Sequence, residues 1–285
     1  MRFTIIFLLL SAWSVARAQD NADYYRRTLP QEFSRKKYGV ESLLKKTAGD
    51  VKIRNRWYIG VDGFLRNDRN TITNTLDDLI GTHSPTVASY AASVGWVIRE
   101  QWALEAEYAR SAIHNDLLIK GDNPLAYRLE NDKNVISFRG KRRLLFGKPY
   151  LRRSAFWIGG GAALVPNSGT QKSYMEFVGY KEKGRRQGID TLYLTSDTYT
   201  ARKTTFLLEA TAEYVIKVAR VADLSFFARK QWGYGNSLQT ELVYSVNSVE
   251  TDRSVIRGNG TGWSLGISLR YVFQLGYDFK DLNSF

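Results

Sequence analysis

The segment 263–273, near the C-terminal end, constrains the fold more than any other stretch of the chain. Its odd-numbered positions carry large apolar side chains, and its even-numbered positions are mostly small, polar or charged: Trp263, Ser264, Leu265, Gly266, Ile267, Ser268, Leu269, Arg270, Tyr271, Val272 and Phe273. Because successive side chains of a strand point to opposite faces, this pattern predicts a β-strand with one continuous apolar face. The segment also reaches the roughly 9–11 residues that a tilted strand needs to cross a bilayer.

Residues 1–18 have the features of a secretory signal peptide. A positive charge precedes an apolar run over 3–13, and Ala16 and Ala18 form a small-x-small cleavage site. We therefore expect the mature chain to begin at Gln19. The rest of the sequence has no apolar run of the roughly 20 residues that a spanning helix needs, so a membrane-crossing mature chain must be a closed barrel. The chain has no cysteine, which excludes disulfides and cysteine-based metal sites.

Segments with a period of two recur along the chain, and the gaps between them alternate between long and short. The predicted strands are 56–67, 87–99, 102–115, 133–146, 150–165, 203–217, 223–234 (with a continuation through 238–246 as an option) and 263–273. The long connections are near 68–86, 116–132, 166–202 and 235–260, and the short ones are near 100–101, 147–149 and 218–222. This alternation is typical of outer-membrane barrels, which have short periplasmic turns and longer outside loops. We predict an all-β, eight-stranded antiparallel up-and-down transmembrane β-barrel over 51–285, with both termini in the periplasm.

A soluble eight-stranded barrel of the lipocalin or avidin kind is the main alternative, because period two does not tell which face is inside. Three features favour the membrane barrel. The loop lengths alternate, and four tryptophans (Trp57, Trp96, Trp102 and Trp263) lie near strand ends, where an aromatic girdle would place them. The third feature is a set of charges on the polar faces that could pair inside a narrow barrel: Asp62, Arg66, Glu105, Glu107, Arg139, Lys141, Arg143, Glu209, Glu213 and Arg270.

The end of the chain resembles small outer-membrane β-barrel proteins of the OmpA/OmpX type. The residues that carry the resemblance match the C-terminal β-signal of that group: Ser264, Gly266, Leu269, Tyr271 and Phe273. The resemblance covers about 51–285 and implies the barrel-assembly machinery as a partner. Members of the group usually end on an aromatic residue of this strand, whereas this chain continues to Phe285. The group has many functions, so the resemblance implies the fold and not one role.

The chain is basic, with 41 lysine and arginine residues against 28 aspartate and glutamate residues and a net charge of +13. Because the chain is exported, we expect lipopolysaccharide and outer-membrane lipid as partners, and no nucleic acid. The densest basic cluster, Lys181, Lys183, Arg185 and Arg186, lies in the longest loop, where it is either a contact for polyanions or a solvated loop tip. The polar, basic segment 19–50 is predicted to be periplasmic and available to a protein partner.

The sequence offers little catalytic chemistry. Its two histidines are His83, next to Ser84, and His114, and both are predicted to be solvated loop residues. Lipid A deacylases place a histidine and a serine two positions apart on one strand face, a spacing that His83 and Ser84 do not have. Two histidines without cysteine make a metal site improbable, and we expect no cofactor. The glycines at 159–161 do not open a helix, so they are predicted to make room for bulky interior side chains rather than to bind phosphate.

The sequence thus predicts a non-enzymatic outer-membrane barrel whose lumen is largely plugged by charged side chains. The predicted roles are envelope integrity, surface contact or adhesion, or a membrane part of a secretion or motility assembly. Two alternatives stay open: an outer-membrane enzyme that acts on lipid A or phospholipid, and a narrow channel of the porin kind.

Overall fold

The computed structural model describes residues 52–84, 86–121, 123–144, 154–182, 188–219 and 221–278. The predicted signal peptide, the segment 19–50 and the predicted turn at 147–149 lie outside these residues. Within this part of the chain, no helix is long and apolar enough to cross a membrane.

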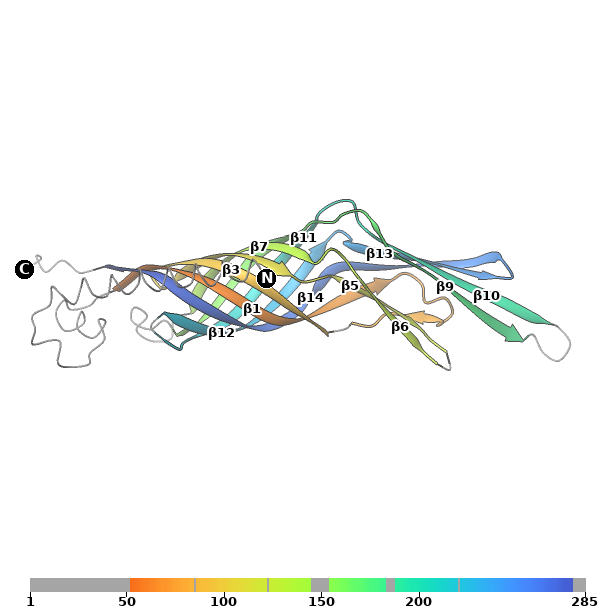
Figure 1. Ribbon diagram of the computed structural model, residues 1–285, viewed down its shortest axis with the longest axis horizontal. Coiled ribbons are helices and arrows are strands. Elements are labelled where there is room, and N and C mark those ends of the chain that lie inside the picture. The colour runs from red at the N-terminus through yellow and green to blue at the C-terminus, as the bar shows by residue number, and fades with distance from the viewer. Residues whose placement is uncertain are drawn as a thin grey trace, which may run out of the picture. The chain divides into compact units, whose positions relative to one another are not determined.

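Eight long strands form a closed antiparallel barrel, which confirms the predicted fold class (Figure 1). In order around the barrel they are β1 (Lys52–Ile72), β3 (Thr86–Ile98), β4 (Trp102–Arg110), β7 (Asn134–Leu144), β8 (Ala155–Val165), β11 (Thr205–Lys217), β12 (Ala222–Tyr234) and β14 (Val249–Asp278). Each strand pairs with its neighbours, and the last strand pairs with the first along most of the length of β1. The closed barrel therefore has no free edge.

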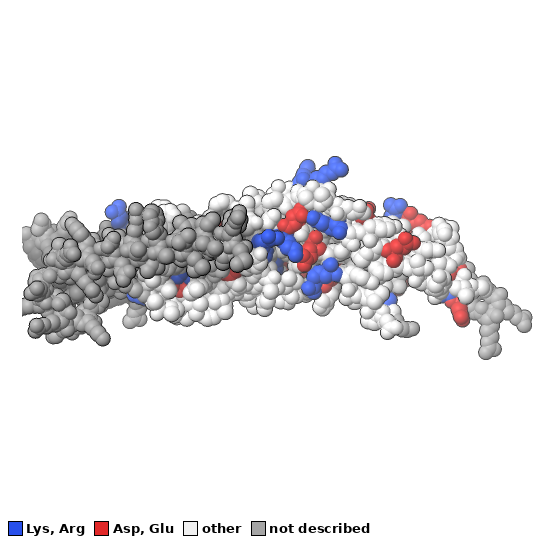
Figure 2. Space-filling view, viewed as in Figure 1, with Lys and Arg blue, Asp and Glu red and all other residues white. Residues whose placement is uncertain are grey.

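The outer face of the barrel is apolar. Val61 of β1 lies opposite Leu269 of β14, and these side chains are 64% and 60% exposed. Similar large exposed residues follow the other barrel strands: Val94, Leu104, Phe138, Ile158, Leu208, Phe226 and Ile267. Figure 2 shows few charged side chains on the visible part of the barrel, and a group of them where the barrel meets the hairpins that extend from it. Such a continuous apolar surface is unsuited to water and fits the hydrocarbon core of a membrane.

Outward-facing tryptophans lie near the ends of the barrel strands. Trp57 stacks on Trp96 with 5.5 Å between ring centroids, close to the short-turn end. Trp102 begins β4 at the same end, and the Arg142 guanidinium lies 5.2 Å from the centre of its ring. Trp263 of β14 lies toward the opposite end of the barrel, where the Lys230 ammonium is 4.6 Å from its ring. Aromatic rings with polar neighbours at both ends suit the two membrane–water boundaries.

The short connection between β3 and β4 is a tight turn with buried support. Arg99 and Glu100 both adopt left-handed backbone conformations, with φ of 51° and 52°, which suits the right-handed twist of the flanking strands. The Glu100 side chain is buried and accepts a 2.6 Å hydrogen bond from Nε of Arg56. This ion pair holds a non-glycine residue in a conformation that it rarely adopts.

The four predicted long loops are largely β-structure, not irregular. They contain β2 (Ile80–Gly81), β5 (His114–Ile119), β6 (Leu125–Glu130), β9 (Gln171–Glu182), β10 (Ile189–Thr200) and β13 (Leu238–Val246). The strands β9, β10 and β13 join the first part of β14 in one sheet, and β2, β5 and β6 form a second sheet. Figure 1 shows these strands extending beyond one end of the barrel. We call them, together with residues 249–258 of β14, the head.

The head has an apolar core of its own between its two sheets. Its buried residues are Leu76, Ile80, Leu117, Leu194, Leu242 and Ile256, and further apolar side chains pack around them: Ile72, Leu79, Ile119, Tyr127, Phe177 and Tyr244. Every one of the four long connections contributes to this cluster. The head is therefore a single packed unit and not a set of independent loops.

Predicted strand boundaries at one end of the barrel are wrong for a common reason. The third strand ends at Arg110 and not at Asn115, and the segment 238–246 is a separate strand, not a continuation of the seventh. The last strand begins at Val249 rather than at Trp263. In each case a strand continues, or a new one begins, above the membrane, where the apolar side chains face the core of the head and the polar side chains face water. The alternation of apolar outward and polar inward side chains therefore ends where the barrel leaves the membrane, although the β-structure continues.

Candidate functional site

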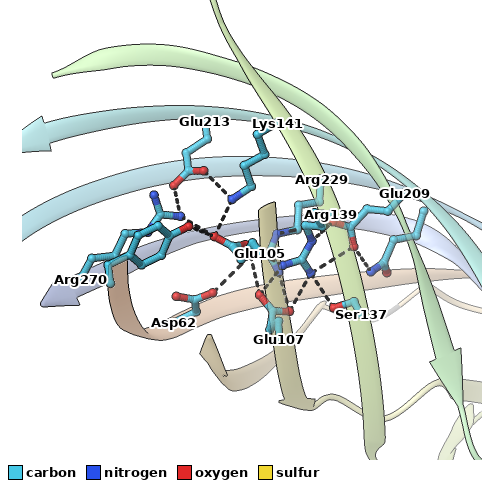
Figure 3. A network of polar contacts seen from close by, with 12 residues as sticks. Asp62, Glu105, Glu107, Ser137, Arg139, Lys141, Glu209, Glu213, Arg229 and Arg270 are labelled. Carbon is cyan, nitrogen blue, oxygen red and sulfur yellow. Dashed lines mark hydrogen bonds and ion pairs between the residues drawn. The ribbon is translucent and has the colours of Figure 1, made fainter. Parts of the chain in front are cut away.

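A layer of charged side chains crosses the middle of the barrel lumen (Figure 3). Its members come from six barrel strands and are all buried: Asp62 (β1), Glu105 and Glu107 (β4), Arg139 and Lys141 (β7), Glu209 and Glu213 (β11), Arg229 (β12) and Arg270 (β14). Each occupies an inward position of an alternating strand whose other face meets lipid. We call this set the charged layer.

Arg139 makes the largest number of contacts in the charged layer. Its Nη1 and Nη2 atoms donate to the two carboxylate oxygens of Glu107 at 2.6 and 2.7 Å, and Nη1 also reaches Glu105 at 3.0 Å. Its Nε atom donates to Glu209 on the other side. The planar guanidinium binds Glu107 through two parallel donors and still reaches other carboxylates, a bidentate geometry that an ammonium group does not offer.

Two glycines of β8 provide the space for these long cations. A Cβ atom at Gly161 would lie 2.9 Å from Cγ of Arg139 and 2.3 Å from the carbonyl oxygen of Phe138. A Cβ atom at Gly159 would lie 2.9 Å from Cγ of Lys141. The glycines therefore let the neighbouring strand and its side chains approach, as the sequence predicted for bulky interior groups.

Arg229 joins opposite walls of the barrel. Its strand β12 is four strands away from β4 in either direction around the barrel. Its guanidinium nevertheless lies 2.8 Å from Glu107 of β4, and 3.3 Å from Asp62 of β1. The same group lies 3.8 Å from the centre of the Phe227 ring. A direct ion pair therefore connects facing walls of the barrel across the lumen.

Arg270, Lys141 and Tyr58 complete the layer on the short-turn side. Lys141 lies 2.8 Å from Glu105 and 2.7 Å from Glu213, and Arg270 contacts the same two carboxylates. The Tyr58 hydroxyl donates to Glu105, and the Arg270 guanidinium lies 4.6 Å from the centre of the Tyr58 ring. Each of these buried charges is paired, as a group without water must be.

Apolar layers lie above and below the charged layer. Toward the head they include Phe64, Ala91, Ala109, Ile113, Val135, Ala163, Val165, Leu207 and Phe227. Toward the short turns they include Tyr58, Val97, Ala103, Ala155, Trp157, Val215 and Val272. The lumen is thus filled by alternating apolar and charged layers, which extends the sequence prediction of an interior filled by charges.

The ten predicted lumen charges separate into three groups. Eight belong to the charged layer. Arg66 lies toward the head, where its Nε atom donates to Asp68 at 2.8 Å. Arg143 lies at the short-turn end, 3.7 Å from Glu100. All ten side chains are buried, but these two do not join the central contacts.

The sequence reading missed several charged members of the lumen. Arg229 and Asp223 both lie on β12. Residues 223, 225, 227, 229 and 231 of this strand face the lumen, but the face of the strand that points inward was not assigned from the sequence. Arg56 was missed as well. It bridges Glu100 and Asp223 with hydrogen bonds of 2.6 and 2.7 Å. Assigning the inward phase over the whole length of the predicted strands 56–67 and 223–234 would have found all three.

The β-signal residues alternate between the lumen and the lipid face of β14. Leu269, Tyr271 and Phe273 lie on the outer face, and Ser264 is buried on the inner face. A Cβ atom at Gly266 would lie 2.5 Å from the Phe227 ring and 2.5 Å from Cβ of Phe64. The packing of the lumen therefore requires glycine at position 266, independently of any role of Gly266 in assembly.

The two histidines differ in their surroundings. His83 is exposed, as predicted, but His114 is buried at the start of β5, so the prediction of a solvated residue is wrong for it. Its Nδ1 atom lies 3.8 Å from Glu130. Burial lowers the pKa of His114 below its usual value, and the charges of Asp68 and Glu130 act in the opposite direction. Within the described residues, no group of three or more metal-ligating side chains is arranged around an ion.

Of the predicted basic cluster, the structure describes one member. Lys181 is exposed near the end of β9. Lys183, Arg185 and Arg186 lie outside the described residues.

Comparison with known proteins gives likenesses of fold. No family model and no curated protein matches the chain. Among solved structures, the outer membrane protein OprG from Pseudomonas aeruginosa is similar over 78% of this chain and 97% of its own, with 10% identity and a TM-score of 0.46. Neisserial surface protein A covers 75% of this chain and 96% of its own, with 14% identity and a TM-score of 0.31. The outer membrane protease OmpT from Escherichia coli covers 79% and 97%, with 11% identity and a TM-score of 0.29.

The architecture itself defines the class of protein. An apolar outer face, aromatic residues toward both strand ends and a buried charged lumen are the features of a transmembrane β-barrel. The closed eight-stranded barrel, with short turns at one end and long hairpins at the other, is that of the small outer-membrane β-barrel proteins. This architecture places the protein in the outer membrane.

Proposed function

We propose that the protein is a non-enzymatic surface-contact protein, in which a closed barrel anchors the head outside the cell. The observation that carries this proposal is the head itself, which has an apolar core built by all four long connections. A protein that served only as a channel would need neither this core nor ion pairs across its lumen. The pair between Arg229 and Glu107, on opposite walls, supports a lumen that does not conduct.

The surroundings of the histidines support a role without catalysis. A general base must reach the proton that it removes. His114 is buried, and His83 is exposed in the connection between β2 and β3. The burial of one histidine and the exposure of the other agree better with structural roles than with an enzyme that acts on lipid A or phospholipid.

Lipopolysaccharide is the proposed lipid partner of the barrel rim. An open pocket of about 580 Å³ at the outer ends of β4, β7 and β8 is lined by Arg110, Lys133, Asn134 and Asn167, among others. Just below it on β4, Tyr108 lies on the exposed apolar face. Cations and amides directly above a lipid-facing surface are placed to meet the phosphates and sugars of the outer leaflet.

The orientation of the head can be tested with single cysteines, because the natural chain has none. We expect Tyr180→Cys, in the head, to react on intact cells with a maleimide that cannot cross membranes. Val218→Cys, in the exposed short connection between β11 and β12, should react only after the outer membrane is permeabilised. The reverse pattern of labelling would contradict a head outside the cell.

The closed lumen can be tested by conductance. In planar bilayers the purified full-length protein should give no stable stepwise current. Reproducible open-channel steps would contradict the anchor and favour the narrow channel.

A further inference from the structure

The strand β9 presents a long free edge. One edge of β9 pairs with β10, from Glu182 opposite Ile189 to Gln171 opposite Tyr199. No described strand pairs with the other edge, since β9 ends the sheet. The free edge has no proline over residues 173–182, and β6, which lies close to β9, does not pair with it. Proteins usually protect such edges, because unpaired N–H and C=O groups are a template for another strand.

The outer face of β9 carries exposed aromatic and apolar side chains between charged ones. Tyr174 and Tyr180 are 59% and 74% exposed, and Val178 between them is half exposed. The inward side chain of Phe177 packs on Tyr127 of β6 with 5.1 Å between ring centroids. The strand is thus anchored to the core on one face, while its free edge and its aromatic outer face have no partner within the described residues.

We propose that the free edge of β9 pairs with β9 of a second copy, antiparallel and centred on Phe177. This inference rests on the proposed function, because it requires the head to lie outside the cell. In an antiparallel pair, two residues directly opposite each other point to the same face of the sheet. In a pair of identical strands, opposed residues must therefore be an even number of positions apart in the sequence, and the two-fold axis passes beside one residue, which lies opposite its own copy. Centring on Phe177 places Tyr174 opposite Tyr180 twice. It also places Glu176 opposite Val178 and Lys181 opposite Ser173.

This register is more self-complementary than those centred on Glu176 and on Val178. Cross-strand aromatic pairs stabilise a sheet, whereas like charges directly opposite destabilise it. Centring on Glu176 would place two glutamates opposite each other, and centring on Val178 would separate both tyrosine pairs. Near the ends of the pairing, Lys172 lies opposite Glu182 of the other copy. The Lys172 ammonium also contacts Asp132 of its own chain. The favoured register therefore has aromatic pairs inside and opposite charges at its ends.

The direction of β9 determines where the second copy is. From Gln171 to Glu182 the strand leads away from the barrel (Figure 1). An antiparallel partner runs the other way, so its barrel lies at the far end of the pair, in an opposed membrane. Copies in one membrane could only align these strands in parallel, which in register would set Glu176 beside Glu176 and Lys181 beside Lys181. The surface contact is thus between two cells that both carry the protein.

Cysteine cross-linking between two cell populations tests the partner and the register together. One population carries Tyr174→Cys and the other carries Tyr180→Cys, both at exposed positions that leave the head core intact. Opposed residues of an antiparallel pair have the short Cβ separation that a disulfide needs. After mild oxidation, we expect dimers on non-reducing gels from the mixture, and at least tenfold fewer from either population alone.

The other outcomes overturn the proposal. Dimers of Tyr174→Cys with itself in one population would indicate parallel pairing in one membrane. Dimers of Tyr174→Cys with Glu182→Cys, but not with Tyr180→Cys, would indicate a register centred on Val178. If both cysteines react with maleimide on intact cells and no mixture gives dimers, the head is outside and its partner is not a second copy. If neither cysteine reacts on intact cells, the proposed function itself fails.

Discussion

The barrel lumen and the head are built on opposite principles within the same strands. In β14, Ile256 points into the apolar core of the head, and the neighbouring Arg257 is exposed. Further along the same strand, Leu265 is exposed on the outside and Ser264 is buried inside. Even-numbered residues point inward in both parts, so the phase of the strand does not change. What changes is the solvent, from water around the head to lipid around the barrel.

This change of solvent explains why the interior of the head and the lumen of the barrel are stabilised by different interactions. In water, burying apolar surface stabilises a fold, so the head packs leucine and isoleucine between its sheets. In lipid, apolar side chains gain little by moving inward, and the narrow lumen holds charged side chains between its apolar layers. Those side chains are then stable only in pairs, because an unpaired charge without water is costly. The lumen depends on pairing, and the head depends on packing.

The largest effect should come from removing the cation with the most partners. We predict that Arg139→Ala lowers the stability of the folded barrel by about 3–5 kcal/mol, because it leaves Glu107 and Glu209 buried without their main counter-charge. The heat-modifiable band on gels should shift at a lower temperature, and leak conductance should rise. Unfolding in urea in lipid vesicles gives the free energy directly.

Two controls make this prediction specific. Lys181→Ala removes an exposed cation and should change neither property. Asp62→Asn should cost much less than Arg139→Ala, because the charged layer holds five carboxylates and four cations among the described residues, and Oδ1 of Asp62 has no hydrogen-bond partner there. Equal and negligible effects of all three substitutions would show that the lumen is open and hydrated.

The second prediction concerns packing in the head. Leu242→Ala removes a fully buried side chain of the head core, and such substitutions cost about 2–5 kcal/mol. Hydrogen exchange should accelerate in β10 and β13, while the temperature at which the barrel shifts on gels stays unchanged. Val243→Ala, the next residue on the outer face of the same strand, serves as the control and should have a small effect. Loss of the barrel in Leu242→Ala would show that the two regions fold as one cooperative unit.

The third prediction concerns the lipid face at the end of the chain. Tyr271→Asp places a carboxylate on the outer face of β14, opposite Ile59 of β1. A basic residue at mid-membrane costs roughly 2–4 kcal/mol and an acidic one less. We expect less protein in the outer membrane, whereas Tyr271→Phe should accumulate like the natural protein. Normal levels of Tyr271→Asp would contradict the assignment of the β-signal.

The barrel could be predicted from the sequence because lipid imposes a simple rule. An alternation such as that of 263–273 predicts a strand with one apolar face, and the alternating connection lengths then favour the membrane barrel over a soluble one. The head could not be predicted in the same way. Its strands are short or mix apolar and polar residues, as in Gln171 to Glu182, and its core is shared by four segments far apart in the sequence. No single segment carries that information.

The lumen charges were predictable as a class, but their contacts were not. Glu105 and Arg139 share the inward phase of neighbouring strands, so their proximity follows from the hairpin. The pair between Arg229 and Glu107 depends on closure of the whole barrel, because it joins strands on opposite walls. The role of Gly266 likewise depends on two distant aromatic rings. Local pattern gives the direction of a side chain, and only the closed fold gives its partner.

The smallest predicted effect is a pH dependence located where the lumen meets the head. The buried His114 has a lowered pKa in the folded protein, so the folded state disfavours its protonated form. Its contribution to stability is therefore complete above the ordinary histidine pKa of about 6.5, and is lost as the pH falls from there toward the lower folded value. Hydrogen exchange of β5 should accelerate below pH 6.5 in the natural protein, and much less in His114→Gln.

Comparing the natural protein with His114→Gln separates the effect of His114 from that of its charged neighbours. Asp68, Glu130, Arg66, Arg128 and Asp116 all face this region and stay in place in His114→Gln. Burial raises the pKa of Asp116, so its own contribution changes with pH in the opposite direction and is shared by both proteins. His83→Gln, at an exposed position, should behave like the natural protein. Each unit by which the pKa is lowered corresponds to about 1.4 kcal/mol, an effect confined to the head. If β5 and the lumen strands respond to pH to the same degree, His114 does not separate the two regions and the acid response belongs to the charged layer.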